Sequence, residues 1–103
     1  MWAQMIKFRL KPGNDDGLLK LVEQLKATEQ SGSGLLRSTA MRDQKDPNTV
    51  YFQIMFESEE KARARENDPR RQEGLAAARV TMGEIFDGAP EFFDLTVVSD
   101  AVY

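Results

Sequence analysis

The sequence predicts an α+β fold, in which a four-stranded antiparallel sheet carries helices on one face. Three observations support this prediction. Four segments alternate apolar and polar side chains with the period of a β-strand, and the stretches between them space their apolar residues as helices do. Clusters of Gly, Pro, Asn and Asp separate these segments. In chain order they give β-α-β-β-α(α)-β, the ferredoxin-like order.

The first strand is predicted over residues 2–10, where apolar side chains recur at every second position. The Pro12-Gly13 pair ends this strand. A helix is predicted over residues 15–31, with Asn14 as its N-cap. Its apolar stripe has helical spacing and consists of Leu18, Leu21, Val22 and Leu25.

The next two strands are predicted at residues 35–42 and 50–56, joined by the hairpin loop "DQKDPNT". Ser58 is a suitable N-cap for the helix that follows. Asp68 and Pro69 interrupt this helix and start a second piece that runs to Phe86, because Asp at the N-cap with Pro at the first helical position is a start signal. The last strand is predicted over residues 91–99.

Both faces of the predicted sheet are apolar, although helices can cover only one. The face that we assign to the helices carries Ile6, Phe8, Phe52, Ile54, Leu95 and Val97. The open face carries Met5, Leu35, Thr39, Met41, Tyr51, Met55, Phe92 and Val98. A large exposed apolar area usually marks an interface, and a two-fold dimer is the commonest way to cover it. We therefore expect a homodimer through the open face; the alternative is that scattered Met and Thr side chains tolerate water.

Composition narrows the possible functions. A chain of 103 residues predicts one domain, over residues 1–103, and the net charge of -3 argues against a nucleic-acid partner. No apolar run approaches the roughly 18 residues of a membrane span, and the start has no signal-peptide pattern, so we expect no membrane partner and a cytoplasmic location. The chain has no Cys and no His. Ser-His and Cys-His catalysis are thereby excluded, and we expect no metal and no cofactor.

Two polar stretches are open to a functional interpretation. The run "RARENDPRR" can bind an anion through Arg63, Arg65, Arg70 or Arg71, since guanidinium pairs well with carboxylate and phosphate. The alternative is a solvated helix face, because acidic residues lie among these arginines at pairing distance. The "SGSG" run can cradle a phosphate, but neither a Gly-rich fingerprint nor a following Lys supports this, and we interpret it as a helix terminator.

Four stretches carry a resemblance to a known family: "IKFRLKPG", "GSGLLRSTAMRDQKDPN", "FQIMFESEEKARAR" and "PEFFDLTVV". Together with the element order, they resemble the antibiotic biosynthesis monooxygenase family of dimeric α+β barrels. The resemblance implies a dimeric barrel. Relatives include cofactor-independent oxygenases of aromatic phenols or quinols, haem-degrading enzymes, and proteins without known activity.

The resemblance also allows the haem-degrading branch to be tested by position. That branch has Asn, Trp and His where this chain has Ile6, Arg65 and Leu75, so haem degradation is excluded. Many oxygenase-like relatives carry a His late in the first helical piece after the third strand. Glu66 occupies that position here, which weakens the case for an active oxygenase.

We expect the ligand site between the sheet and the helices, because a helix broken at Asp68-Pro69 leaves a gap beside the break. The residues predicted to line it are Ile6, Phe52 and Ile54, with Arg65 at the mouth and Gln4 on the same side of the sheet. Gln4 either meets a ligand there or lies at the frayed end of its strand. The expected ligand is small and apolar or aromatic, and no catalytic residue is identified. The resemblance implies a cofactor-free monooxygenase reaction on a phenol or quinol; the alternative is a non-enzymatic ligand-binding or structural dimer.

Overall fold

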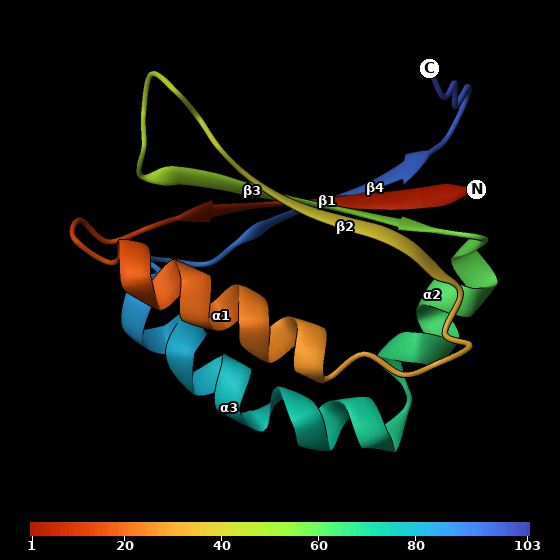
Figure 1. Ribbon diagram of the computed structural model, residues 1–103, viewed down its shortest axis with the longest axis horizontal. Helices are drawn as coiled ribbons and strands as arrows, with labels where there is room; N and C mark the ends of the chain where they lie inside the picture. Colours follow the sequence, from red (N-terminus) through yellow and green to blue (C-terminus); the bar gives the residue numbers. More distant parts are fainter.

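A computed structural model describes all residues, 1–103, and has one four-stranded antiparallel sheet in the order β2-β3-β1-β4. The strands are β1 (Trp2–Arg9), β2 (Leu35–Arg42), β3 (Thr49–Phe56) and β4 (Glu91–Thr96). The helices are α1 (Asp15–Ala27), α2 (Glu59–Glu66) and α3 (Pro69–Ile85). All three helices lie on one face of the sheet, with α2 at the end where β3 leaves it (Figure 1). The predicted element order and fold are confirmed.

The main core lies between the sheet and the two longer helices, α1 and α3. It is formed by the buried side chains Ile6, Phe8, Leu10, Leu18, Leu21, Val50, Phe52, Leu75, Ala78, Ile85 and Phe86. Two glycines bring the helices close together. A Cβ atom on Gly17 would lie 2.6 Å from Ile85 Cγ2, and one on Gly74 would lie 3.0 Å from Thr28 Cγ2, so neither position accepts a side chain without a shift.

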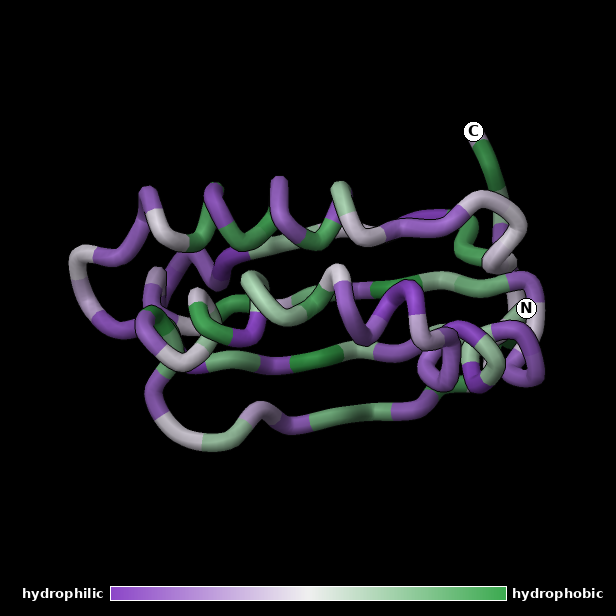
Figure 2. The backbone as a smooth tube through the Cα atoms, turned by 90° about the horizontal axis from the view of Figure 1, so that it is seen from below, coloured by the Kyte–Doolittle hydropathy of each residue, from purple (hydrophilic) through white to green (hydrophobic).

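The side of the helices that faces away from the sheet is mixed in character. Purple and green segments alternate along the turns of the long helices when the molecule is viewed from that side (Figure 2). This pattern is typical of surface helices that bury one stripe and expose the other. None of the three helices combines the length and apolar character needed to cross a membrane.

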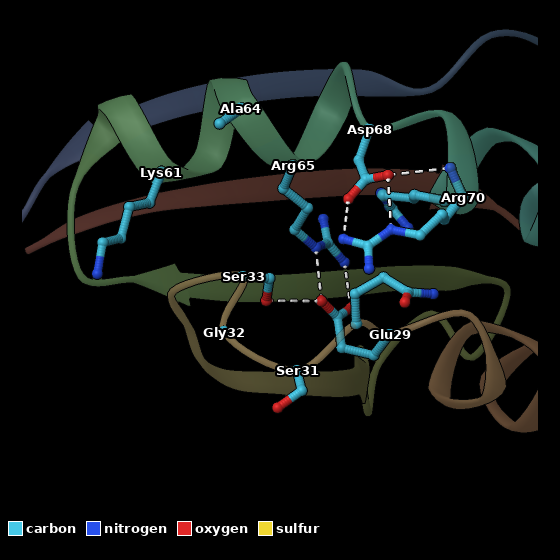
Figure 3. A pocket seen from close by; sticks show the side chains of 11 residues that line it. Glu29, Ser31, Gly32, Ser33, Lys61, Ala64, Arg65, Asp68 and Arg70 are labelled. Atoms are coloured by element: carbon cyan, nitrogen blue, oxygen red, sulfur yellow. Dashed lines mark hydrogen bonds and ion pairs between the residues drawn. The ribbon is translucent and has the colours of Figure 1, made fainter.

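Local capping explains why one long helical stretch divides into α2 and α3. Ser58 Oγ accepts a hydrogen bond from the Lys61 backbone N–H (3.2 Å), as predicted for the start of α2. Asp68 Oδ1 accepts one from the Arg70 N–H (2.9 Å), and Pro69 occupies the first turn of α3. Because α2 ends at Glu66, its last turn points Arg65 towards the end of α1 rather than along α3 (Figure 3).

The predicted orientation of the last strand is wrong. Leu95 pairs with Ala3 and therefore belongs to the open face, whereas Phe92 pairs with Ile6 and belongs to the helix side. The reason is Asp94, which accepts hydrogen bonds on the helix side from Gln4 Nε2 (3.1 Å) and from Arg63 Nη2 (2.9 Å). These two bonds place the polar residue inward and turn its apolar neighbours outward. Val97 and Val98 lie beyond β4, so they belong to neither face.

Leu35 also lies on the opposite face from the one predicted. It pairs with Phe56, and the register shifts between Leu35 and Arg37, which is the mark of a β-bulge. The extra residue reverses the alternation at the start of β2. After the bulge, Thr39 and Met41 lie on the open face as predicted. The apolar part of the open face therefore consists of Ala3, Met5, Met41, Tyr51, Met55, Phe93 and Leu95.

Candidate functional site

The centre of the candidate site is an ion pair between Arg65, at the end of α2, and Glu29, just after α1. Arg65 Nε donates to Glu29 Oε1 (2.9 Å) and Nη2 donates to Oε2 (2.6 Å), which is a bidentate pair. The two side chains are only 11% and 25% exposed. Ser33 Oγ donates a third bond to Glu29 Oε1 (2.9 Å), as Figure 3 shows.

The carboxylate of this pair is held in its ionised form. Burial raises the pKa of the Glu29 carboxyl, but the hydrogen bonds and the charge of Arg65 outweigh burial and leave the pKa below its ordinary value. The Arg65 guanidinium also lies over the Phe56 ring, 5.3 Å from its centroid, which is cation–π distance. Arg65 Nη1 donates to no protein acceptor. One donor of a well-fixed cation is therefore free for a ligand.

An apolar cavity, here called the Phe52 cavity, lies on one side of the pair between α1 and the strands β2 and β3. Its volume is about 220 Å³. The lining residues are Val22, Leu25, Lys26, Glu29, Leu35, Ser38, Ala40, Phe52 and Arg65. Apolar walls with a few polar groups are the usual composition of a small-molecule site.

A polar cavity, here called the loop cavity, lies on the other side of the pair and beside the break between α2 and α3. Its volume is about 160 Å³. The lining residues are Glu29, Gln30, Ser31, Gly32, Ser33, Lys61, Ala64, Arg65, Asp68, Arg70 and Arg71. Glu29 and Arg65 line both cavities, so the ion pair forms the wall between them.

The structure brings together two of the residues predicted to line the site and separates the other three. Phe52 and Arg65 both line the Phe52 cavity. Ile6 is buried in the main core, and Ile54 is half-buried where the two apolar clusters meet. Gln4 lies towards β4, where its amide donates to Asp94. The gap beside the helix break exists, but its walls are polar, and the apolar space lies on the β2 side of Arg65.

Glu29 is the site residue that was missed in the sequence. It follows α1, whose C-terminal end carries the negative pole of the helix dipole, so a carboxylate there is unfavourable without a nearby cation. That conflict is the signal that points to a partner such as Arg65, although it does not say which cation. No group of three or more acidic side chains is arranged around a common point where a metal ion would bind.

Comparison with known proteins places the chain in a family. The sequence model of the antibiotic biosynthesis monooxygenase family matches residues 1–77. The chain belongs to this family. The matched region runs from β1 into α3 and contains both Glu29 and Arg65. No curated protein sequence matches the chain.

Solved structures share the fold over nearly the whole chain. A candidate antibiotic biosynthesis monooxygenase from Chloroflexus aurantiacus has a TM-score of 0.70 at 24% identity, covering 98% of this chain and 96% of its own. A candidate monooxygenase from Caulobacter crescentus has a TM-score of 0.76 at 17% identity, with coverages of 95% and 90%. SnoaB, a cofactor-independent oxygenase from Streptomyces nogalater, has a TM-score of 0.72 at 12% identity, with coverages of 96% and 94%. At these identities the likeness establishes the fold alone.

Proposed function

We propose that this protein binds a small aromatic phenol or quinol in the Phe52 cavity and oxygenates it without a cofactor. The observation that carries the proposal is the cavity itself, whose apolar walls end at the fixed guanidinium of Arg65. Apolar walls suit an aromatic ring, and the free donor of Arg65 suits a phenolate oxygen. Membership of the antibiotic biosynthesis monooxygenase family supports the reaction type.

The chemistry needs little from the protein beyond position and charge. An electron-rich quinol supplies the electrons that reduce dioxygen; one oxygen atom enters the product and the other leaves as water. A cation beside the ring stabilises the phenolate, which is the form that reacts with dioxygen. The apolar side chains of Val22, Leu25 and Phe52 provide a surface against which the ring would pack. Arg65 is the residue of this chain in position to supply that charge.

Filling the Phe52 cavity tests the proposal. Ala40→Leu puts a larger side chain into the lining, whereas Ala77→Leu makes the same change on the exposed side of α3. Naphthol binding, followed by calorimetry, should weaken about tenfold or more in the first variant, as expected for the loss of roughly 1.4 kcal/mol, and stay unchanged in the second. Oxygen uptake with naphthohydroquinone, above its rate without protein, should follow the same order. Equal naphthol affinity in both variants would exclude this cavity as the site.

Ligand binding without turnover is the second candidate function, and one observation favours it. The titratable groups that line the Phe52 cavity are Lys26, Glu29 and Arg65. Glu29 is bonded to Arg65 and has a lowered pKa, which makes it a weak base. Naphthol binding with no oxygen uptake above the rate without protein would support this second function over the first.

We also propose that the protein is a homodimer through the open face of the sheet. The exposed fractions of Met41, Phe93 and Leu95 are 39%, 43% and 42%, and these side chains lie on the two edge strands of that face, β2 and β4. Two copies packed face to face would cover them. Met55→Glu would bury an unpaired charge at such a contact and should give monomers by sedimentation. A wild-type protein that sediments as a monomer at micromolar concentration would contradict the proposal.

A further inference from the structure

Arg71, on the first turn of α3, differs from the other cations around the loop cavity. Arg65 is bonded to Glu29, Arg70 is bonded to Asp68, and Lys61 is bonded to Glu57. The Arg71 side chain makes no hydrogen bond to any protein group, and its Nη1 atom is buried without a partner. Buried polar atoms are nearly always hydrogen-bonded, so an unpaired nitrogen on a charged group requires an explanation.

We propose that the loop cavity binds a small oxyanion, either free phosphate or a phosphate monoester, with Arg71 as the principal ligand. This inference goes beyond the proposed function and does not rest on it. The guanidinium fork matches the geometry of phosphate oxygens and can bind two of them at once. A bound oxyanion would supply the counter-charge that the Arg71 side chain lacks.

The charge of the cavity favours an anion. Four cationic and two anionic side chains line it, which leaves two positive charges in excess. Even when Lys61 is counted with Glu57, which lies outside the lining, the charge of Arg71 remains without a counterion. Burial lowers the pKa of Arg71, and the nearby charge of Arg65 lowers it further. The negative charge of a bound anion would raise the pKa again.

The loop that closes the cavity offers further donors. No backbone N–H of Gln30, Ser31, Gly32 or Ser33 donates to a protein acceptor. Gly32 has a φ of +79°, which is the left-handed region that Gly adopts most readily. Consecutive unpaired N–H groups in a turn that contains a left-handed residue are a common element of phosphate sites. The two chain segments therefore offer donors of two kinds, guanidinium and backbone amide.

The carboxylates of Glu29 and Asp68 also line the cavity and would repel an anion. Each of them is already engaged by a cation: Arg65 binds both oxygens of Glu29, and Arg70 binds both oxygens of Asp68. Their charges are therefore largely compensated where they lie. Arg71 has no such partner, so an incoming anion gains an interaction without breaking an existing pair.

Titration of the isotope-labelled protein with inorganic phosphate at constant ionic strength tests this proposal. The backbone amides of Gln30–Ser33 and the Arg71 Nε–H should shift to a saturating end point in the NMR spectrum. Phenyl phosphate is the second probe: tighter binding than phosphate would identify a monoester as the better ligand, and equal binding would identify the free ion. Absence of saturation with both probes, or equal shifts with chloride, would overturn the proposal.

Variants make the assignment to Arg71 specific. Arg71→Gln should weaken phosphate binding about tenfold or more, because it removes a charged donor. Arg37→Gln, on β2 and outside the cavity, should leave binding unchanged. If Arg71→Gln fails to fold, Arg71→Lys keeps the charge but loses the fork, and should still weaken binding several-fold. Naphthol affinity should be the same in Arg71→Gln as in the wild type, which separates this site from the Phe52 cavity. Phosphate affinity that is unchanged in the Arg71 variants would contradict the inference.

Discussion

The Phe52 cavity and the loop cavity share a wall but differ in chemical character. Glu29 and Arg65 line both. The Phe52 cavity takes its other walls from the middle of α1 and from β2 and β3, whereas the loop cavity takes them from a loop and from the junction of two helices. Side chains in the middle of regular elements face a core and are apolar. The ends of helices need caps and counter-charges, so the space between them is polar.

This difference makes the Arg65–Glu29 pair the feature that keeps the two cavities apart. A charged pair is stable there because Arg65 binds both oxygens of Glu29 and Ser33 donates a further hydrogen bond from the loop. Loss of either member would leave a half-buried charge at the boundary. Substitutions of these residues therefore measure how much the pair contributes to stability and to ligand binding.

Glu29→Gln should have the largest effect on stability. It leaves Arg65 without a counter-charge at a site where that side chain is 11% exposed. The free energy of unfolding should fall by about 2–3 kcal/mol, which for a domain of this size lowers Tm by about 10 °C or more. Glu23→Gln is the matched control on α1, because Glu23 pairs with Lys26 in full exposure and should leave Tm nearly unchanged. Thermal unfolding followed by circular dichroism measures both, and equal Tm values would show that the pair adds no stability.

Lowering the pH should remove the stability that the Arg65–Glu29 ion pair contributes. The pKa of Glu29 is lowered in the folded protein from its ordinary value of 4.5. A lowered pKa stabilises the folded state above the unfolded value, and this stability is lost as pH falls through the folded pKa. The difference in stability between wild type and Glu29→Gln should therefore be full at neutral pH and should shrink from about pH 5 downward. Other carboxylates titrate equally in both proteins, so a difference that stays constant with pH would rule out Glu29 as its source.

Arg65→Ala should affect both stability and ligand affinity. Arg65 is bonded to Glu29 through two nitrogens, so its removal should lower Tm as well as naphthol affinity. The affinity should fall about tenfold or more, since a hydrogen bond to a charged group is worth roughly 1.5–3 kcal/mol. Arg63→Ala is the matched control on α2, because Arg63 is bonded to Asp94 on β4 and does not line the Phe52 cavity. If naphthol binds the two variants with the same affinity, Arg65 is not part of the binding site.

The parts of the fold that follow from local signals were predicted correctly from the sequence. The caps at Ser58 and Asp68, with Pro69 after the latter, gave the starts of α2 and α3 because each cap depends on residues within a turn. The apolar stripe of α1 was predicted as well, and two of its members, Val22 and Leu25, line the Phe52 cavity.

The errors have long-range causes. The orientation of β4 depends on Asp94 meeting Arg63, which is 31 residues away in the chain. Alternation alone favoured the more apolar set of residues as the inner one. In the same way, Arg65 stood out as a cation near a helix break, but its partner Glu29 is 36 residues away. Local pattern indicates that such a charge needs a partner; only the folded arrangement says which residue supplies it.

Ser33→Ala should give the smallest effect and shows how far the loop supports the shared wall. Ser33 Oγ donates to Glu29 Oε1 (2.9 Å) and accepts from the Leu35 N–H (3.3 Å). Its removal should cost about 1 kcal/mol, or roughly 4–8 °C in Tm. Ser31→Ala is the matched control, because Ser31 lines the loop cavity but makes no side-chain hydrogen bond. In a Glu29→Gln background, most of the Ser33→Ala effect should disappear, since the two residues act through one contact. If the two effects simply add in thermal unfolding, then the loop stabilises the fold independently of the pair.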